Sequence, residues 1–185
     1  MIILFGVVGS GKSEQANRMI AKLKCPLIST SDLLRETHNP EWQEIMLSGK
    51  LVPDEAIFEL LEPELKKARA DKNECILDGA PRSIPQAEWL SNKIKSREVK
   101  LTAVIYFKVS KETTMKRLLN RGREDDTEEV IAERFRQYDA NTMPVLIYLS
   151  SQGYPVYEIN GELTSDKVET EIWQVLKDKV EAKKR

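Results

Sequence analysis

The first 23 residues read MIILFGVVGSGKSEQANRMIAKL (1–23), and this stretch decides the fold. It begins with an unbroken apolar run at residues 2–5, which is short and ends at Gly6, as expected of a buried parallel strand. Beyond residue 13, apolar residues recur at 16, 19, 20 and 23, the spacing of one helix face. The segment between them, GVVGSGKS (6–13), is rich in glycine. The sequence therefore predicts a strand, a glycine-rich loop and a helix in direct succession.

The loop at residues 6–13 matches the pattern G-x-x-x-x-G-K-S/T, which is typical of phosphate-binding loops. Glycines let the backbone approach a ligand closely, so loop N–H groups can point at phosphate oxygens in front of the helix N-terminus. Lys12 would reach the outer phosphates, and the Ser13 hydroxyl would face a magnesium ion. A glycine-rich turn that matches by chance is the alternative, and the flanking strand and helix make it the weaker interpretation.

The composition favours a cytoplasmic protein without nucleic-acid or membrane partners. The chain has 185 residues, enough for one domain (1–185) with a sizeable core. Its 29 basic and 30 acidic residues leave a net charge of −1, which gives no argument for binding to nucleic acid or a membrane. Cys25 and Cys75 lack metal-ligand spacing and suit a reducing compartment. The apolar start has no basic leader, and no stretch approaches the ~20 apolar residues of a transmembrane helix.

Strand signals alternate with helix signals along the whole chain. Apolar or β-branched runs occur at residues 2–5, 26–29, 75–77, 103–107 and 156–159, with helical periodicity between them. This alternation predicts an α/β fold, with a five-stranded parallel sheet and helices on both faces. Ligands of such sheets bind beyond the carboxyl ends of the strands. The segments at 6–13, 30–35 and 78–82 directly follow strands, so we expect them to meet at one edge.

Charged side chains that suit phosphate chemistry follow these strands. Asp78 ends a buried strand, where phosphate-loop enzymes place an acid for magnesium, although a turn or cap residue is the simpler alternative. Arginine follows the second and third strands and recurs along one later stretch, at Arg35, Arg82, Arg117, Arg121, Arg123 and Arg134. Solvated surface arginines are the alternative. Planar guanidinium groups match phosphate oxygens, so we expect these arginines to converge on a moving phosphoryl group.

Local signals also predict several helix boundaries. Thr30 or Ser31 could cap the helix after the second strand. Pro63 lies inside a helical pattern and should kink or divide that helix, and Pro144 should bend a helix or start another. Asp126 with Glu129 resembles a capping box.

Four segments, in this order and spacing, resemble the nucleoside monophosphate kinase family, and adenylate kinases in particular. GVVGSGKSEQ (6–15) resembles G-x-P-G-S/A-G-K-G-T-Q, and ISTSDLLR (28–35) resembles I-S-T-G-D-L/M-L-R. LDGAPRSIPQAE (77–88) resembles L-D-G-F-P-R-T-x-x-Q-A-E. REDDTEE (123–129), followed by Arg134, Tyr138 and the triplet TMP (142–144), resembles R-x-D-D-x-E-E with R, Y and T-x-P. GKLVPDE (49–55) also agrees with the family, so the resemblance covers nearly the full chain.

The resemblance implies a reversible reaction of MgATP with AMP that gives two ADP, in a monomer whose partners are ATP, AMP and ADP. It implies that ATP is bound by Gly9, Ser10, Gly11, Lys12, Ser13, Arg117 and Arg121. It implies that AMP is bound by Thr30, Arg35, Val52, Gly79, Arg82 and Gln86. The catalytic cations would be Lys12, Arg82, Arg121, Arg123 and Arg134, and Ser13 and Asp78 would hold Mg²⁺, mainly through water.

Departures from the family pattern leave two alternatives open. Ser31 replaces a glycine and Ala80 a phenylalanine near the acceptor site, which suggests another acceptor such as CMP, UMP or dAMP. The NMP-binding arm (around residues 30–58) is shortened, and the lid (around 120–127) is minimal, because only Gly122 separates Arg121 from Arg123. Such trimming suggests a nucleotide-binding module or weak ATPase with regulatory output. The retained arginines favour the kinase, and the lid has no cysteines that could bind zinc.

Overall fold

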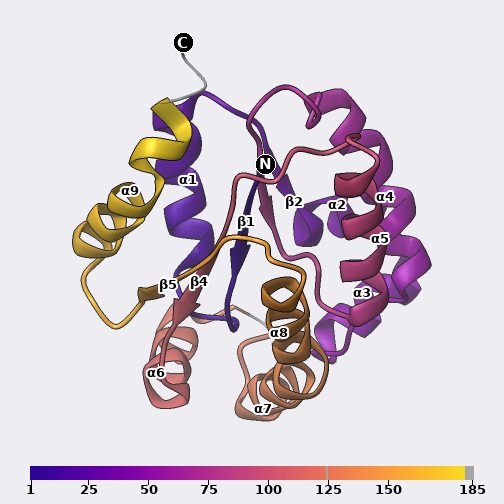
Figure 1. Cartoon of the computed structure of the whole chain (residues 1–185). Helices are drawn as coiled ribbons and strands as arrows, with labels where there is room; N and C mark the ends of the chain where they lie inside the picture. The colour runs from indigo at the N-terminus through magenta and orange to yellow at the C-terminus, as the bar shows by residue number, and fades with distance from the viewer. Residues whose placement is uncertain (124, 182–185) are drawn as a thin grey trace.

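A parallel sheet forms the centre of the protein. The computed structural model describes residues 1–123 and 125–181. Within them, five strands form one parallel sheet in the order β2-β3-β1-β4-β5 (Figure 1). The strands are β1 (Ile2–Phe5), β2 (Leu27–Ser29), β3 (Ile76–Asp78), β4 (Ala103–Lys108) and β5 (Val156–Asn160). Each overlaps a predicted strand, and the predicted fold class is confirmed. In the central strand β1, Ile3 lies opposite Leu77 of β3 and Val104 of β4.

Helices cover both faces of the sheet, with α1 and α9 on one of them (Figure 1). The helices are α1 (Lys12–Leu23), α2 (Thr30–Glu36), α3 (Pro40–Leu47), α4 (Asp54–Ala68), α5 (Ile84–Lys95), α6 (Lys111–Arg121), α7 (Glu128–Gln137), α8 (Met143–Ser151) and α9 (Ser165–Glu181), with a π-helical turn, η1 (Tyr138–Thr142), between α7 and α8. Met19 of α1 and Ile172 of α9 pack with Ile2 and Leu4 in one apolar core. This core anchors the helix that follows the glycine loop.

The opposite face of the sheet is covered by α2, α4, α5 and α8. Leu61 of α4, Leu90 of α5 and Leu149 of α8 pack with Ile3 and Leu77 in a second core. Successive residues of β1 therefore face opposite cores, which explains why the run at residues 2–5 is apolar without interruption. The two cores together fix the sheet, and the sheet fixes the position of its carboxyl edge.

A smaller apolar cluster lies at the carboxyl edge, beside the glycine loop. Val7 of the loop packs with Leu118 of α6 and with Ile131 and Phe135 of α7. The cluster therefore holds α6 and α7, which carry three of the six arginines singled out in the sequence, next to the loop.

Two prolines lie within helical segments and act differently. Pro144 is the second residue of α8, which agrees with the prediction that it starts a new helix. Pro63 lies inside α4, which continues through it, so the predicted division of this helix is wrong. Burial of Leu61 and Leu65 against the second core stabilises α4 on both sides of Pro63 and offsets the missing N–H donor.

The predicted helix caps also differ from the observed ones. Thr127 caps α7, since its hydroxyl accepts a hydrogen bond from the N–H of Val130 at 3.3 Å. The capping box predicted for Asp126 is therefore wrong, and this carboxylate is buried instead. Ser29 precedes α2, so Thr30 lies within the helix and is not its cap.

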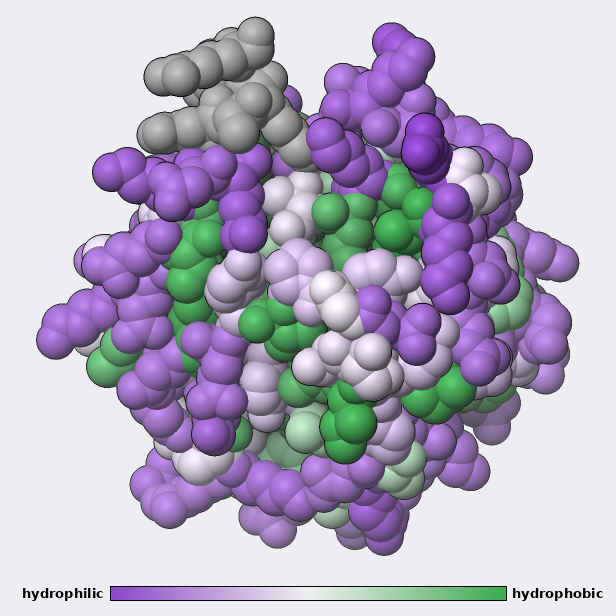
Figure 2. Space-filling view, in the orientation of Figure 1, coloured by the Kyte–Doolittle hydropathy of each residue, from purple (hydrophilic) through white to green (hydrophobic). Residues whose placement is uncertain are grey.

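The surface is mainly hydrophilic, with apolar residues scattered over it. Figure 2 shows hydrophilic residues around the rim of one face and apolar or weakly polar residues nearer its centre. The large apolar side chains that are exposed, Leu47, Leu119 and Ile147, lie on three different helices. In the described part of the chain, no helix combines the length and apolar character needed to cross a bilayer.

The packing of α9 on the sheet is tested by two matched truncations. Ile172→Ala should lower the free energy of unfolding by about 2–5 kcal/mol, because Ile172 is 0% exposed and its removal leaves a cavity. Ile147→Ala should change it by less than about 0.5 kcal/mol, because Ile147 is 69% exposed. Urea unfolding followed by circular dichroism measures both. Equal losses would contradict the position of α9 described above.

Candidate active site

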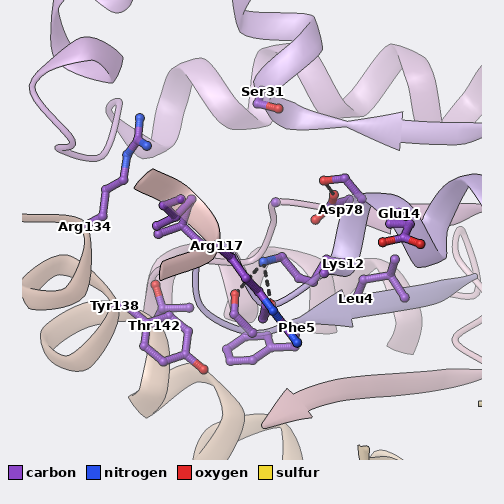
Figure 3. A pocket seen from close by; sticks show the side chains of 18 of the residues that line it. Leu4, Phe5, Lys12, Glu14, Ser31, Asp78, Arg117, Arg134, Tyr138 and Thr142 are labelled. Atoms are coloured by element: carbon purple, nitrogen blue, oxygen red, sulfur yellow. Dashed lines mark hydrogen bonds between the residues drawn. The ribbon is translucent and has the colours of Figure 1, made fainter. Parts of the chain in front are cut away.

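A cavity of about 630 Å³ lies at the carboxyl edge of the sheet (Figure 3). Its walls come from segments far apart in the sequence: the loop after β1, the segment after β3, α2, α6, α7 and the start of α9. A recess of about 50 Å³ shares Ser31, Gly79 and Arg82 with the cavity. The volume of the cavity lies in the range of small-molecule sites, ~300–1,000 Å³.

The structure brings the predicted site residues together around these two spaces. The main cavity is lined by Gly9, Ser10, Gly11, Lys12, Ser13, Arg35, Asp78, Gly79, Arg82, Arg117, Arg121, Arg123 and Arg134. Thr30, Val52 and Gln86 line only the recess, together with Gly79 and Arg82. The residues predicted for the donor nucleotide and those predicted for the acceptor thus lie around two connected spaces.

The glycine loop wraps around the ammonium group of Lys12. Its Nζ donates hydrogen bonds to the carbonyl oxygens of Gly6 at 2.7 Å and Val7 at 2.9 Å (Figure 3). Burial lowers the pKa of Lys12 to about 8; the carboxylate of Asp78 opposes this shift, and the charges of Arg82 and Arg121 add to it. Lys12 therefore remains mostly protonated at pH 7.

Asp78 and Ser13 face each other beside the loop. Asp78 is the last residue of β3 and is buried, and its Oδ2 accepts a hydrogen bond from Ser13 Oγ at 3.0 Å. Among residues 1–123 and 125–181, no group of three or more His, Cys, Asp or Glu side chains is placed to hold a metal ion. One carboxylate and one hydroxyl suit a magnesium ion that takes its other ligands from phosphate oxygens and water. The two residues therefore fit a metal that arrives with a nucleotide.

Thr30 and Gly79 make the closest approach between the α2 and β3 segments. Thr30 Oγ1 donates to the carbonyl oxygen of Asp78 at 3.4 Å. A Cβ atom on Gly79 would lie only 2.1 Å from Thr30 Oγ1, and the backbone φ angle of Gly79 is +95°. Both the space and the backbone conformation therefore require glycine at this position.

Arg121 of α6 and Arg134 of α7 are held by two carboxylates. Arg121 makes a two-bond contact with Asp126, from Nε to Oδ2 at 2.8 Å and from Nη2 to Oδ1 at 2.6 Å. Arg134 pairs with Asp125, and its Nη1 lies 3.5 Å from Asp126 Oδ1. The hydrogen bond from Arg121 lowers the pKa of Asp126, and the N–H of Arg123 and the charge of Arg134 act in the same direction against the effect of burial. Asp126 is thus a buried, ionised anchor for this group.

Two further contacts at the site have no signal in the sequence that predicts them. Arg117 Nη2 donates to the carbonyl oxygen of Gly161 at 2.9 Å, which ties α6 to the end of β5. Thr142 Oγ1, in η1, donates to the carbonyl oxygen of Arg82 at 3.1 Å. The sequence shows Thr142 only as part of a motif, and its contact with Arg82 depends on the packing of α8 against α5.

The loop between α3 and α4 lies close to α7. A Cβ atom on Gly49 would lie 2.9 Å from the carbonyl oxygen of Val130, and the φ angle of Gly49 is +79°. Hydrogen bonds from Gln137 and Arg136 lower the pKa of Glu133 in α7. The charge of Lys50, the residue after Gly49, makes a smaller contribution in the same direction. The segment predicted as the acceptor arm is therefore close to the helix that carries Arg134.

The central strand, glycine loop and helix place the chain in the class of P-loop proteins, which bind nucleotide phosphates. Comparison with known proteins identifies the family within this class. A family model described as adenylate kinase matches residues 4–154. The chain is 39% identical over 153 residues to an adenylate kinase of Corynebacterium urealyticum, covering 80% of this chain and 84% of the relative.

Two other relatives agree. An adenylate kinase of Mycobacterium sp. (strain MCS) is 42% identical over 151 residues, which covers 78% of this chain and 83% of the relative. An adenylate kinase of Oenococcus oeni is 38% identical over 172 residues, which covers 88% and 91%. The chain belongs to the adenylate kinase family. The resemblance inferred from the sequence motifs is confirmed.

The contact between Gly79 and Thr30 gives a prediction for stability. Gly79→Ala and Gly153→Ala both place alanine at a positive φ angle, which costs about 1–2 kcal/mol. Only Gly79→Ala also creates a clash, which should add about 1–3 kcal/mol, because no atom lies within 4 Å of a Cβ on Gly153. Urea unfolding compares the two variants. Equal losses in the free energy of unfolding would contradict the prediction, because they would mean that Thr30 moves away from the added Cβ at no cost.

Proposed function

We propose that this chain catalyses the reversible transfer of the terminal phosphoryl group of MgATP to AMP, giving two ADP. The observation that carries this proposal is the gathering of Lys12 and six arginines around one cavity, next to a recess that shares part of its lining. Holding a single nucleotide needs fewer cations. Moving a phosphoryl group between two anionic nucleotides needs positive charge on every side of it.

ATP would occupy the main cavity. The N–H groups of the loop at residues 9–13 and the ammonium group of Lys12 would bind its phosphates. Arg117, which is held beside the loop by its hydrogen bond to Gly161, would stack on the adenine ring. Arg121 and Arg123 would close on the phosphates from the lid side.

The base of AMP would lie at the recess and its phosphate in the adjoining part of the main cavity. Thr30, Val52, Gly79 and Gln86 would surround the base. Arg82, which borders both spaces, and Arg35, which lines the main cavity, would bind the phosphate of AMP and direct it towards the ATP. Of the two departures from the family pattern, Ala80 lines only the main cavity, and Ser31 lines both spaces, with its hydroxyl 3.2 Å from that of Ser29.

The reaction would need positioning and charge but no strong base. The attacking oxygen belongs to the AMP phosphate, which is already an anion, and the only histidine, His38, does not line the cavity. Lys12, Arg82, Arg121, Arg123 and Arg134 would neutralise the negative charge on the transferred group. Ser13 and Asp78 would hold Mg²⁺ with phosphate oxygens and water, and the ion would neutralise further charge on the phosphates.

Two moving parts would surround this site in a single domain. The NMP-binding arm would comprise residues 30–58, and the lid residues 120–127, of which Glu124 lies outside the described residues. Asp125 and Asp126 would hold Arg121 and Arg134 until phosphates replace them.

We also propose a monomer that works in the cytoplasm in nucleotide biosynthesis. The small number of cysteines, Cys25 and Cys75, which suits a reducing compartment, and the net charge of −1 support this location.

The experiment that tests the proposal measures ADP formation from MgATP with AMP, CMP, UMP, GMP or dAMP. AMP should give the strongest signal. Lys12→Ala should lower the rate by at least about a hundredfold, because it removes a preorganised charge at the phosphates. Lys116→Ala, which removes an exposed lysine of α6, is the matched control and should leave the rate unchanged. Tight ATP binding without transfer to any acceptor would favour the regulatory module instead.

The lowered pKa of Lys12 predicts how ATP binding depends on pH. Phosphate needs the protonated ammonium, so the affinity should be full below pH 8 and fall by up to about tenfold per pH unit above it. The second ionisation of phosphate, near pH ~6, is complete in this range. Calorimetric titration between pH 7.5 and 9.5 measures the effect. Lys12→Arg should flatten it, because a guanidinium does not titrate there. A constant affinity in the original protein would contradict the prediction.

A further inference from the structure

The side-chain amide of Gln86 is held at both of its polar ends. Gln86 is 4% exposed and lies in the first turn of α5, at the wall of the recess. Its Oε1 accepts a hydrogen bond from the backbone N–H of Arg82 at 2.7 Å. Its Nε2 donates to Oδ1 of Asp54, the first residue of α4, at 2.7 Å. Asp54 does not line the recess itself, and its hydrogen bond to Gln86 links it to the wall of the recess.

These two partners allow only one orientation of the amide. A backbone N–H can only donate, and a carboxylate can only accept. Turning the Gln86 amide over would place its NH₂ group against the N–H of Arg82 and its oxygen against the carboxylate of Asp54. Leaving buried polar groups opposed in this way is costly.

The supports of Gln86 are themselves fixed. Asp54 Oδ1 also accepts a hydrogen bond from the hydroxyl of Ser83 at 2.7 Å, and Ser83 caps α5 by accepting the N–H of Gln86 at 3.3 Å. The carbonyl oxygen of Arg82 accepts the hydroxyl of Thr142 at 3.1 Å. Asp54 and the Arg82 backbone are therefore tied to α5 and η1, and the amide orientation is set before a ligand arrives.

The amide keeps one donor and one acceptor for a ligand. Of the two N–H bonds of Nε2, one points at Asp54, and of the two lone pairs of Oε1, one accepts from Arg82. A 6-aminopurine offers the matching groups, an amino donor at C6 and an acceptor at N1. A 6-oxopurine offers the reverse, an oxygen at C6 and an N–H at N1, and would need the amide turned over.

We propose that Asp54 is a positioning residue that makes the acceptor recess selective for 6-aminopurine over 6-oxopurine nucleotides, by fixing the orientation of the Gln86 amide. This inference rests on the proposed phosphorylation of AMP. Asp54 touches neither substrate nor the transferred group, and its effect reaches the base only through Gln86.

The test compares AMP with inosine monophosphate (IMP), which has a 6-oxopurine base, as acceptors for MgATP. Asp54→Ala should raise the KM for AMP about tenfold with kcat changed less than about twofold, and should lower the AMP-to-IMP ratio of kcat/KM about tenfold. Glu55→Ala removes the neighbouring acid in the first turn of α4 and should change neither value, since Glu55 is exposed. Asp54→Asn keeps the volume of the side chain, but its amide can face either end of the Gln86 amide, so it should also lower the AMP-to-IMP ratio. It is the variant to use if Asp54→Ala folds poorly.

A double mutant shows whether Asp54 acts through Gln86. In a Gln86→Leu background, Asp54→Ala should change the AMP-to-IMP ratio less than about twofold, because the amide it orients is gone. An equal loss of activity towards AMP and IMP in Asp54→Ala would overturn the inference. Asp54 would then stabilise the structure without affecting selectivity. Equal use of AMP and IMP by the original protein would also overturn it. Absence of transfer to either acceptor would instead overturn the proposed function.

Discussion

The parallel pairing of β1 with β3 and β4 is the constraint on which the site depends. It places the carboxyl ends of these strands at one edge of the sheet, so the glycine loop, Asp78 and the start of α5 lie side by side. A slip of β3 by one residue would turn Asp78 to the opposite face and away from Ser13. The apolar cores on the two faces of the sheet oppose such a slip, because it would move the buried side chains of β3 from one core into the other.

Within this frame, the cations of the site are stabilised in two different ways. Lys12 is held by carbonyl oxygens of its own loop, and burial lowers its pKa. Arg121 and Arg134 are held by the carboxylates of Asp126 and Asp125. In the proposed reaction, a phosphate would displace carboxylates that are hydrogen-bonded to these two arginines, whereas the hydrogen-bond acceptors of Lys12 are neutral and the Asp78 carboxylate acts on it through its charge.

The sequence predicts the parts of this structure that depend on local pattern. The glycine loop, the five strands and the nearby arginines all follow from periodicity and spacing. Asp126 was misread because its local context resembles a helix cap, whereas its partners Arg121 and Arg134 come from two helices. The bond between Asp54 and Gln86 was not predicted for a similar reason: 32 residues separate them, and they meet only because α4 packs on α5. The continuation of α4 through Pro63 was also not predicted, because burial of the apolar residues of α4 outweighs the local helix-breaking preference of proline.

The approach of Gly49 to α7 constrains how this chain can change in evolution. Its φ angle of +79° and the Val130 carbonyl oxygen, 2.9 Å from where a Cβ would lie, each oppose any side chain at this position. A mutation of Gly49 would become acceptable only after the backbone of α7 had shifted. Such a shift would also move Arg134, which lies on the same helix. The loop between α3 and α4 and the helix α7 are therefore expected to change together in evolution.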